Sequence, residues 1–195
     1  MIDPVRICGV GFDASLRSDT FEGSMSTTVN LNGLNFEAVS GLATQIKAKP
    51  TLSATTWRAA VRWTGAFRSE ATVRKFPPIA SDEPTTLGGT DSAPNPVEQL
   101  LAALGNCLVV GYVLNASALG ITITDLRISV EGDIDLHTFL SLADGHAGYE
   151  SIRAKVTLTA DADEEQRQAL HKRVMGTSPV GHTLTRAIPV QVDLG

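Results

Sequence analysis

The apolar and polar positions in the first half of the chain indicate one helix followed by a pair of strands. Residues 36–47 place apolar side chains at the three- and four-residue spacing of a helix, and Pro50 ends the run. Residues 57–67 alternate between apolar and polar positions, and residues 70–76 have the composition of a returning strand that stops before Pro77. We therefore predict a helix and then an antiparallel pair of strands.

The strongest element of the sequence is a long apolar helix, predicted over residues 95–119. Asn95 is suited to the N-cap and Pro96 to the first helical position, and Glu98 completes a capping box with Asn95. Gly120 ends the helix. Because its side chains are apolar on almost every side, we expect this helix to lie buried at the centre of the fold.

The second half of the chain predicts two more strands, a second helix and a last strand. Residues 121–134 and 149–160 alternate as strands, and residues 135–148 have the composition of a loop with a short helical turn. Residues 163–176 carry acidic side chains at the start and basic ones near the end, as a helix favours. Residues 188–194 alternate again. This order indicates an α+β fold with antiparallel sheets packed on two central helices.

The beginning of the chain is open to two interpretations. Residues 1–24 mix glycine with serine and aspartate, and their apolar residues show no regular spacing. Met25, in contrast, opens a β-rich run that ends at the turn signal Asn32-Gly33. In the first interpretation residues 1–24 are a tail outside a single domain of residues 25–195. In the second, Val5 to Phe12 forms a genuine first hairpin.

The length and net charge of the chain limit the classes of protein to which it can belong. A chain of 195 residues with 43% hydrophobic and 19% charged residues has the size and composition of one globular domain. Its net charge of -5 argues against a protein that binds the phosphate backbone of nucleic acids. We expect no apolar stretch of the roughly 18 residues that span a membrane, and the N-terminus lacks the pattern of a secretion signal. We therefore expect a cytoplasmic protein without a bound cofactor, nucleic-acid partner or membrane partner.

The two cysteines, Cys8 and Cys107, form no Cys-x-x-Cys motif, and the four histidines form no His-x-x-x-His pair. We expect neither a structural zinc site nor a disulfide framework. Taken alone, a cysteine in an apolar helix such as Cys107 is a small buried hydrophobic residue.

A spaced set of motifs adds a chemical interpretation. Residues 82–89 read Asp-Glu-Pro-x-x-Leu-Gly-Gly, and residues 94–107 read Pro-Asn-Pro-Val-Glu-Gln-Leu-Leu-Ala-Ala-Leu-Gly-Asn-Cys. Together with the strand at residues 121–133 and Ser178-Pro179-Val180 near the C-terminus, the set closely resembles the OsmC/Ohr family over roughly residues 54–195.

The resemblance implies an α+β domain that forms an intertwined homodimer with sites at the subunit interface. It also implies reduction of organic hydroperoxides. In such proteins a cysteine on the central helix attacks the peroxide, while an arginine from an early strand and a glutamate near the helix start hold that cysteine as thiolate. A second cysteine, just before a Pro-Val or similar pair, resolves the sulfenic acid as a disulfide, which dithiols of the lipoyl type then reduce.

The resemblance places Cys107 where the attacking cysteine belongs. A thiol ordinarily ionises at about pH 8.5 and reacts as the thiolate, so a reactive cysteine in a buried helix needs a positive charge nearby. The helix dipole acts mainly within the first turn, and Cys107 lies about three turns into its helix. Arg68 is the candidate cation by position, with Arg62 and Arg74 as alternatives; the other interpretation of Arg68 is a solvated turn residue.

The sequence departs from the family at two points. Val97 occupies the place of the glutamate that follows the proline in the family's peroxidases, and Glu98 lies nine residues before Cys107. A helix turns by about 100° per residue, so Glu98 falls on the opposite face. It is either a capping-box residue or an ionic partner of the arginine. Ser178 stands in the neighbourhood of the second cysteine, so the internal resolving thiol is missing, and Cys8 is its only substitute.

Two functions are compatible with this sequence. The first is a thiol-dependent peroxidase that reduces organic hydroperoxides with Cys107, Arg68 and Glu98 as site residues and an external thiol as reductant. The second is a non-catalytic homodimer that binds a small hydrophobic molecule in its apolar interface pocket. The missing second cysteine favours binding, whereas the presence of Cys107 favours chemistry. His182 either lines the same pocket or lies in a surface loop.

Overall fold

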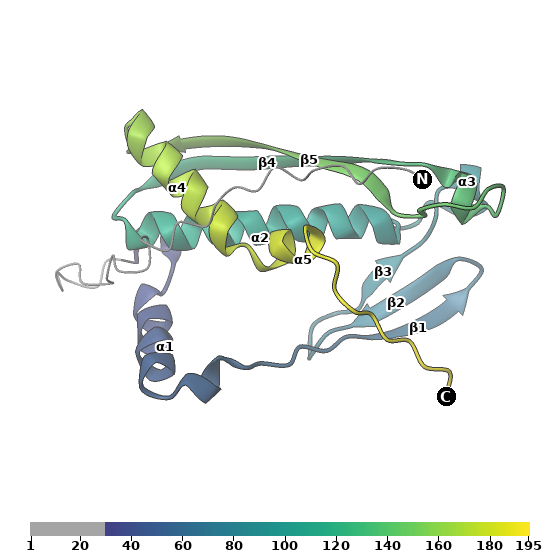
Figure 1. Ribbon diagram of the computed structural model, residues 1–195, viewed down its shortest axis with the longest axis horizontal. Helices are drawn as coiled ribbons and strands as arrows, with labels where there is room; N and C mark the ends of the chain where they lie inside the picture. The colour runs from purple at the N-terminus through teal and green to yellow at the C-terminus, as the bar shows by residue number, and fades with distance from the viewer. Residues whose placement is uncertain (1–29) are drawn as a thin grey trace, which may run out of the picture.

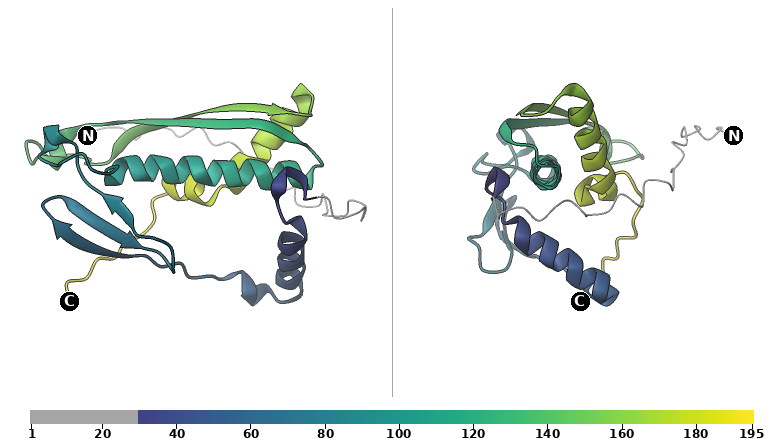
Figure 2. Two further views of the ribbon diagram at one scale, coloured as in Figure 1. Left: turned by 180° about the vertical axis from the view of Figure 1, so that it is seen from behind. Right: turned by 90° about the vertical axis from the view of Figure 1, so that its left-hand side faces the viewer.

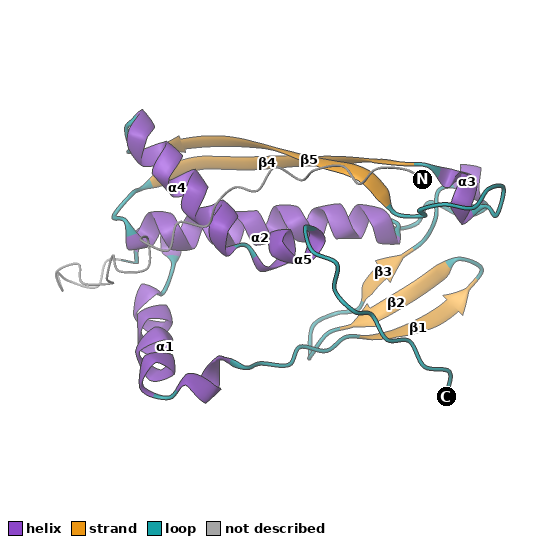
Figure 3. Ribbon diagram, viewed as in Figure 1, coloured by secondary structure: helices purple, strands orange, loops and turns teal. Residues whose placement is uncertain are grey.

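A computed structural model describes residues 30–195, which fold as helices packed on antiparallel sheets (Figures 1 and 3). In chain order the helices and strands are α1 (Phe36–Ala48), β1 (Ala60–Gly65), β2 (Arg68–Thr72), β3 (Ile79–Ser81), α2 (Pro96–Ala118), β4 (Ile123–Ile134), α3 (Leu136–Phe139), β5 (Tyr149–Ala160), α4 (Glu164–Thr177) and α5 (Pro179–Leu184). The fold class is therefore α+β, as predicted.

Helix α2 lies along one face of a long ribbon made by β4 and β5 (Figure 1). The two strands are 12 residues long and pair antiparallel, with Leu126 opposite Leu158 and Ile128 opposite Val156. These apolar side chains pack against the core, while residues between them, such as Arg127, are exposed. The alternation in the sequence thus gives the ribbon one face toward the helix and one toward solvent.

The core forms where α2 meets this ribbon and α4. Helix α2 contributes apolar residues at intervals of four, which places them in one stripe along the helix. The buried apolar residues of the described chain are Leu104, Leu108, Tyr112, Ala116, Ile121, Leu170 and Val174. Full burial of one large apolar side chain contributes roughly 1.5–3 kcal/mol, so this stripe fixes α2 against its neighbours.

The sheet of β1, β2 and β3 and the helix α1 project away from α2 on the side opposite the β4–β5 ribbon (Figure 2). Within a single chain the large apolar side chains of this region are exposed, with Trp57 at 78% and Trp63 at 75%. The segment after α5 is similar, with Val190 at 78% and Val192 at 87%. Exposed apolar surface of this extent is typical of an interaction site.

Most of the predicted elements are confirmed. The three long helices are observed as α1, α2 and α4 within one residue of their expected bounds, and residues 149–160 form β5. The first two strands are shorter than predicted, and β3 was not predicted, because three residues are too few to show a period. The prediction of a last strand is wrong, because residues 188–194 form no strand in the described chain. Alternation favours extended backbone, but a strand also needs a neighbouring strand with which to pair.

The predictions for the beginning of the chain lie outside the described residues. Both the tail of residues 1–24 and the alternative hairpin Val5 to Phe12 fall there. Of the β-rich run from Met25, the end is described, and Leu31–Gly33 forms a turn of 3-10 helix.

The expectation that no stretch is apolar enough to span a membrane is wrong, because α2 passes that test by length and composition. Packing against β4, α4 and α5 accounts for the apolar residues on part of the helix. Only 28% of its most apolar stretch is buried within the single chain. Val110 is 65% exposed on the uncovered part.

Candidate functional site

Cys107 lies in the middle of α2 and faces the start of the short helix α5. Its Sγ atom is 3.3 Å from Oγ of Ser178, although 71 residues separate the two in sequence. The thiol is free and half-buried. Part of its surface therefore remains accessible, which a cysteine that serves only as core filling does not need.

The local sequence explains why Ser178 reaches the sulfur. Helix α4 ends at Thr177 and Pro179 occupies the first position of α5, so the chain changes direction between them. Ser178 is the N-cap of α5: its Oγ accepts the N–H of Gly181 at 3.1 Å. The serine is only 2% exposed. Its hydroxyl is therefore held in place from one side by α5 and meets Cys107 on the other.

The candidate arginines all lie on or beside the β1–β2–β3 sheet and are exposed. Arg62 forms an ion pair with Glu70 at 2.7 Å, and the guanidinium carbon of Arg74 lies 4.7 Å from the centre of the Phe76 ring. Arg68 begins β2, directly after the turn. Among residues 30–195 of one chain, no hydrogen bond or ion pair joins any of these arginines to the thiol on α2.

Glu98 lies on the helix face opposite Cys107, as the nine-residue spacing predicts. Its carboxylate accepts the backbone N–H of Asn95 at 2.9 Å, and the Asn95 side chain accepts the N–H of Glu98 at 2.9 Å. The predicted capping box is therefore present, with Pro96 at the start of the helix. Within the described chain Glu98 acts on the helix start and has no hydrogen bond to Cys107.

A buried carboxylate organises the loop before α2. Asp82 is 1% exposed and accepts the backbone N–H groups of Glu83, Thr90 and Ser92 and the hydroxyls of Thr90 and Ser92. The Thr90 hydroxyl first, and then the bonds from Ser92 and Glu83, hold the pKa of Asp82 well below its usual range despite burial. Gly89 lies against Glu83 so closely that a Cβ would be 1.8 Å from the Glu83 carbonyl oxygen. The sequence motif marked this loop but gave no sign of the role of Asp82.

An open cavity of about 830 Å³ lies between α2 and the β4–β5 ribbon. Its walls include Leu101, Val109 and Val130, and its polar side chains are Glu98, Asn106, Glu131 and Tyr149. Glu98, Leu101 and Val109 lie on the side of α2 away from Cys107. The cavity and the thiol are thus separate features of one helix.

Tyr149 ties the ribbon to the start of α2. Its ring lies over Gly132, where a Cβ would be 2.7 Å from the ring carbon Cδ1. Its hydroxyl donates to the carbonyl of Val97 at 3.0 Å. Burial, and secondarily the charge of Glu98, raises the pKa of Tyr149.

The family of OsmC-like proteins matches residues 89–193. The chain belongs to this family. Solved structures similar to it include an OsmC-like protein from Mycoplasma pneumoniae (22% identity, TM-score 0.59, covering 67% of this chain and 88% of the other). An organic hydroperoxide resistance protein OsmC from Legionella pneumophila is 15% identical with a TM-score of 0.53, covering 67% and 91%. An OsmC-like protein of unknown function from Vibrio cholerae is 10% identical, also with a TM-score of 0.53, covering 67% and 94%. None of the curated proteins matches the chain in sequence.

At these identities the solved structures establish the OsmC-like fold. The segment that matches the family contains Cys107, Glu98 and Ser178. Asp82 and the candidate arginines precede the matched segment.

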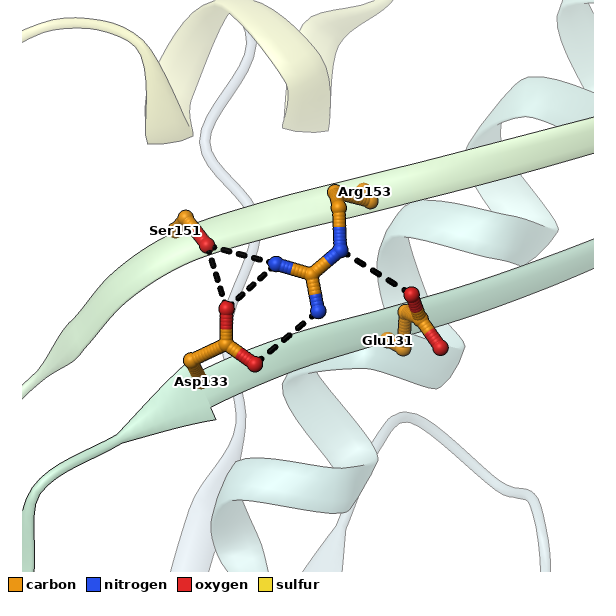
Figure 4. Close-up of polar contacts among 4 residues, drawn as sticks. All are labelled: Glu131, Asp133, Ser151 and Arg153. Carbon is orange, nitrogen blue, oxygen red and sulfur yellow. Dashed lines mark hydrogen bonds and ion pairs between the residues drawn. The ribbon is translucent and has the colours of Figure 1, made fainter.

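Two other polar clusters of this OsmC-like protein lie away from the thiol. On the outer face of the ribbon, Arg153 bridges Glu131 at 2.9 Å and Asp133, which also accepts the Ser151 hydroxyl at 2.7 Å (Figure 4). The hydrogen bonds from Arg153 and Ser151 lower the pKa of Asp133. Because all four residues are exposed, this network contributes little to stability.

The second cluster is on the inner side of the fold. The hydroxyl of Tyr112, which is 2% exposed, bonds Nδ1 of the exposed His171. Burial raises the pKa of Tyr112. The bond lets a tyrosine of the core stripe satisfy its hydroxyl at the edge of α4.

Proposed function

We propose that this protein is a thiol-dependent peroxidase that reduces organic hydroperoxides with Cys107 as its attacking residue and an external thiol as its reductant. The observation that carries the proposal is the 3.3 Å approach of Cys107 Sγ to Ser178 Oγ. Ser178 precedes Pro179-Val180, the place in which two-cysteine members of the family hold the resolving thiol. This contact supports the proposal, because it brings the helix cysteine next to the position where the family resemblance puts the resolving thiol and where this chain has a hydroxyl.

The reaction follows from these two groups. The Cys107 thiolate attacks the distal oxygen of the hydroperoxide, the O–O bond breaks, and the alkoxide leaves as an alcohol after taking a proton. The sulfur is oxidised to a sulfenic acid. An external thiol then displaces water to form a mixed disulfide, and a second thiol releases the reduced cysteine together with an oxidised disulfide. Such thiols are kept reduced in the cytoplasm, which is where we place the protein.

The proposed functional unit is a homodimer. The uncovered part of α2, where Val110 is 65% exposed, and the β1–β2–β3 sheet, where Trp63 is 75% exposed, are apolar surfaces that a second copy would cover. We further propose Arg68 as the cation that stabilises the Cys107 thiolate, with Arg62 and Arg74 as alternatives. Arg62 already pairs with Glu70, which favours Arg68. Glu98 supports the site by capping α2.

A second candidate function rests on the cavity of about 830 Å³ beside α2. Its largely apolar walls suit a small hydrophobic molecule, and Glu98 and Tyr149 would orient a polar group on it. This function is that of a non-catalytic binding module and does not need Cys107.

Intact-mass analysis after one equivalent of an organic hydroperoxide separates the two functions. The peroxidase is expected to gain one oxygen, Cys107→Ser to gain none, and Cys8→Ser, the matched control, to behave like the unaltered chain. A loss of two hydrogens in the unaltered chain would instead identify Cys8 as a resolving thiol. An unmodified Cys107 under conditions that oxidise a free control thiol would contradict the peroxidase and leave the binding module.

A further inference from the structure

The hydroxyl of Ser178 is the polar group that meets the sulfur of Cys107, and its own surroundings determine what it can do there. It is 2% exposed, so it cannot rotate freely into solvent. One of its lone pairs is taken by the N–H of Gly181 at 3.1 Å. A backbone N–H can only donate, so the hydrogen of the Ser178 hydroxyl remains free for another partner. The sulfur of Cys107 lies within reach of it at 3.3 Å, and either atom can be the donor.

The protonation state of Cys107 determines the direction of this bond. A thiol can donate to the second lone pair of Ser178, or accept from its hydroxyl. A thiolate carries no hydrogen and can only accept, so in the reactive form Ser178 must be the donor. A donor held by its own cap is oriented before the reaction begins and stabilises the negative charge on the sulfur.

We propose that Ser178 is a positioning residue for Cys107: its hydroxyl donates to the thiolate, and it closes the α5 side of the sulfur. The inference rests on the proposed function. It gives Ser178, which stands where the family resemblance puts a resolving thiol, a role in stabilising the thiolate of Cys107.

The same geometry defines the route to the sulfur. Because Ser178 occupies the side toward α5, the hydroperoxide and the reducing thiol must both approach from the remaining exposed side. In one chain that side carries Ala103 and Val110, which lie one turn before and after Cys107 on the same helix face, so in the proposed homodimer both molecules must reach the sulfur along the edge of the interface. Both steps therefore use one approach, and the alcohol must leave before the thiol enters.

Three variants test the role of Ser178, each in a Cys8→Ser background so that Cys107 alone reacts. Ser178→Ala removes the donor, Ser178→Thr keeps a hydroxyl, and Leu184→Ala weakens the packing of α5 without touching the hydroxyl. Each is measured by alkylation of Cys107 with iodoacetamide, which needs no peroxide, and by oxidation with an organic hydroperoxide. Thermal unfolding shows that the variants fold.

Loss of the donor removes a charge-assisted hydrogen bond from the thiolate, which lowers the rate of alkylation. The less stabilised thiolate is the better nucleophile, so a net decrease of about threefold is expected in the alkylation rate of Ser178→Ala. Ser178→Thr should restore the rate and Leu184→Ala should leave it unchanged. Equal rates in Ser178→Ala and the parent, or an equal decrease in Leu184→Ala, would overturn the inference. If alkylation follows the expected order but no variant is oxidised by peroxide, the inference stands and the peroxidase function fails.

Discussion

Gly111 of α2 faces Val174 of α4 so closely that a Cβ on the glycine would lie 2.9 Å from a methyl carbon of the valine. Val174 is completely buried, and as a β-branched residue it has little freedom to turn away. The approach of the two helices, and with it the path of the chain toward Ser178, depends on the missing side chain.

Gly111→Ala is therefore expected to destabilise the protein. The added methyl improves helix propensity by about 1 kcal/mol, but overpacking against a stiff core residue costs about 1–3 kcal/mol. We expect a net loss of up to about 2 kcal/mol in urea unfolding. Gly176→Ala is the control, since a Cβ there meets nothing within 4 Å, and it should be neutral or stabilising. Equal effects of the two variants would contradict the close packing.

The sequence was sufficient for elements whose signals are local. The capping box of Asn95 and Glu98 placed the start of α2, and alternation placed β5. Residues 188–194 show the limit of such signals: their alternation is genuine, but a strand exists only where another edge pairs with it. Proximity across the chain is a second limit. No spacing rule predicts the 3.3 Å approach of Cys107 and Ser178, and only the family resemblance pointed to that neighbourhood.

Asp82 should make stability depend on pH on the acid side. Its pKa in the folded chain lies below the value of about 4 expected when unfolded, so the unfolded state binds more protons between the two values. Its contribution to stability is present above about pH 4 and is lost as the pH falls through the folded value. Asp82→Asn should be less stable than the parent at pH 7, and the difference should shrink toward pH 3. Urea unfolding across this pH range is the measurement, with the exposed Asp91→Asn as control. If the difference in unfolding free energy between Asp82→Asn and the parent did not change with pH, the proposed role of Asp82 in acid stability would be refuted.

Tyr149 and Gly132 should be energetically coupled. Gly132→Ala places a Cβ 2.7 Å from the tyrosine ring and displaces the hydroxyl from Val97, so a loss of about 1–3 kcal/mol is expected. In a Tyr149→Ala background the same substitution should cost less, because the ring is gone and only the tight contact with the Ser151 carbonyl oxygen at 3.1 Å remains. A double-mutant cycle by urea unfolding measures this coupling; additive effects would show that the ring does not depend on the glycine.

The proposed homodimer predicts a specific effect of charge on α2. Val110 is 65% exposed in the single chain, so Val110→Glu should be tolerated by the monomer fold but should place an unpaired charge in the dimer interface. Light scattering at micromolar concentration should give a dimer for the parent and a monomer for Val110→Glu. Ser129→Glu, on the exposed face of β4, should remain dimeric. A monomeric parent chain would contradict the proposed assembly.

Ser178→Cys should convert the site into one with two thiols. Sγ of Cys107 and Oγ of Ser178 are already 3.3 Å apart. A disulfide needs a sulfur–sulfur distance of about 2 Å, so its formation requires α2 and the start of α5 to move about an ångström closer. After one equivalent of an organic hydroperoxide, the sulfenic acid on Cys107 should react with the new thiol and release water. The intact mass should then show a loss of two hydrogens in place of the gain of one oxygen expected for the parent.

Thr177→Cys is the matched control: it adds a thiol one residue away on an exposed position, and it should still gain one oxygen. A stable sulfenic acid in Ser178→Cys would mean that the two positions do not meet in solution as they do in the fold.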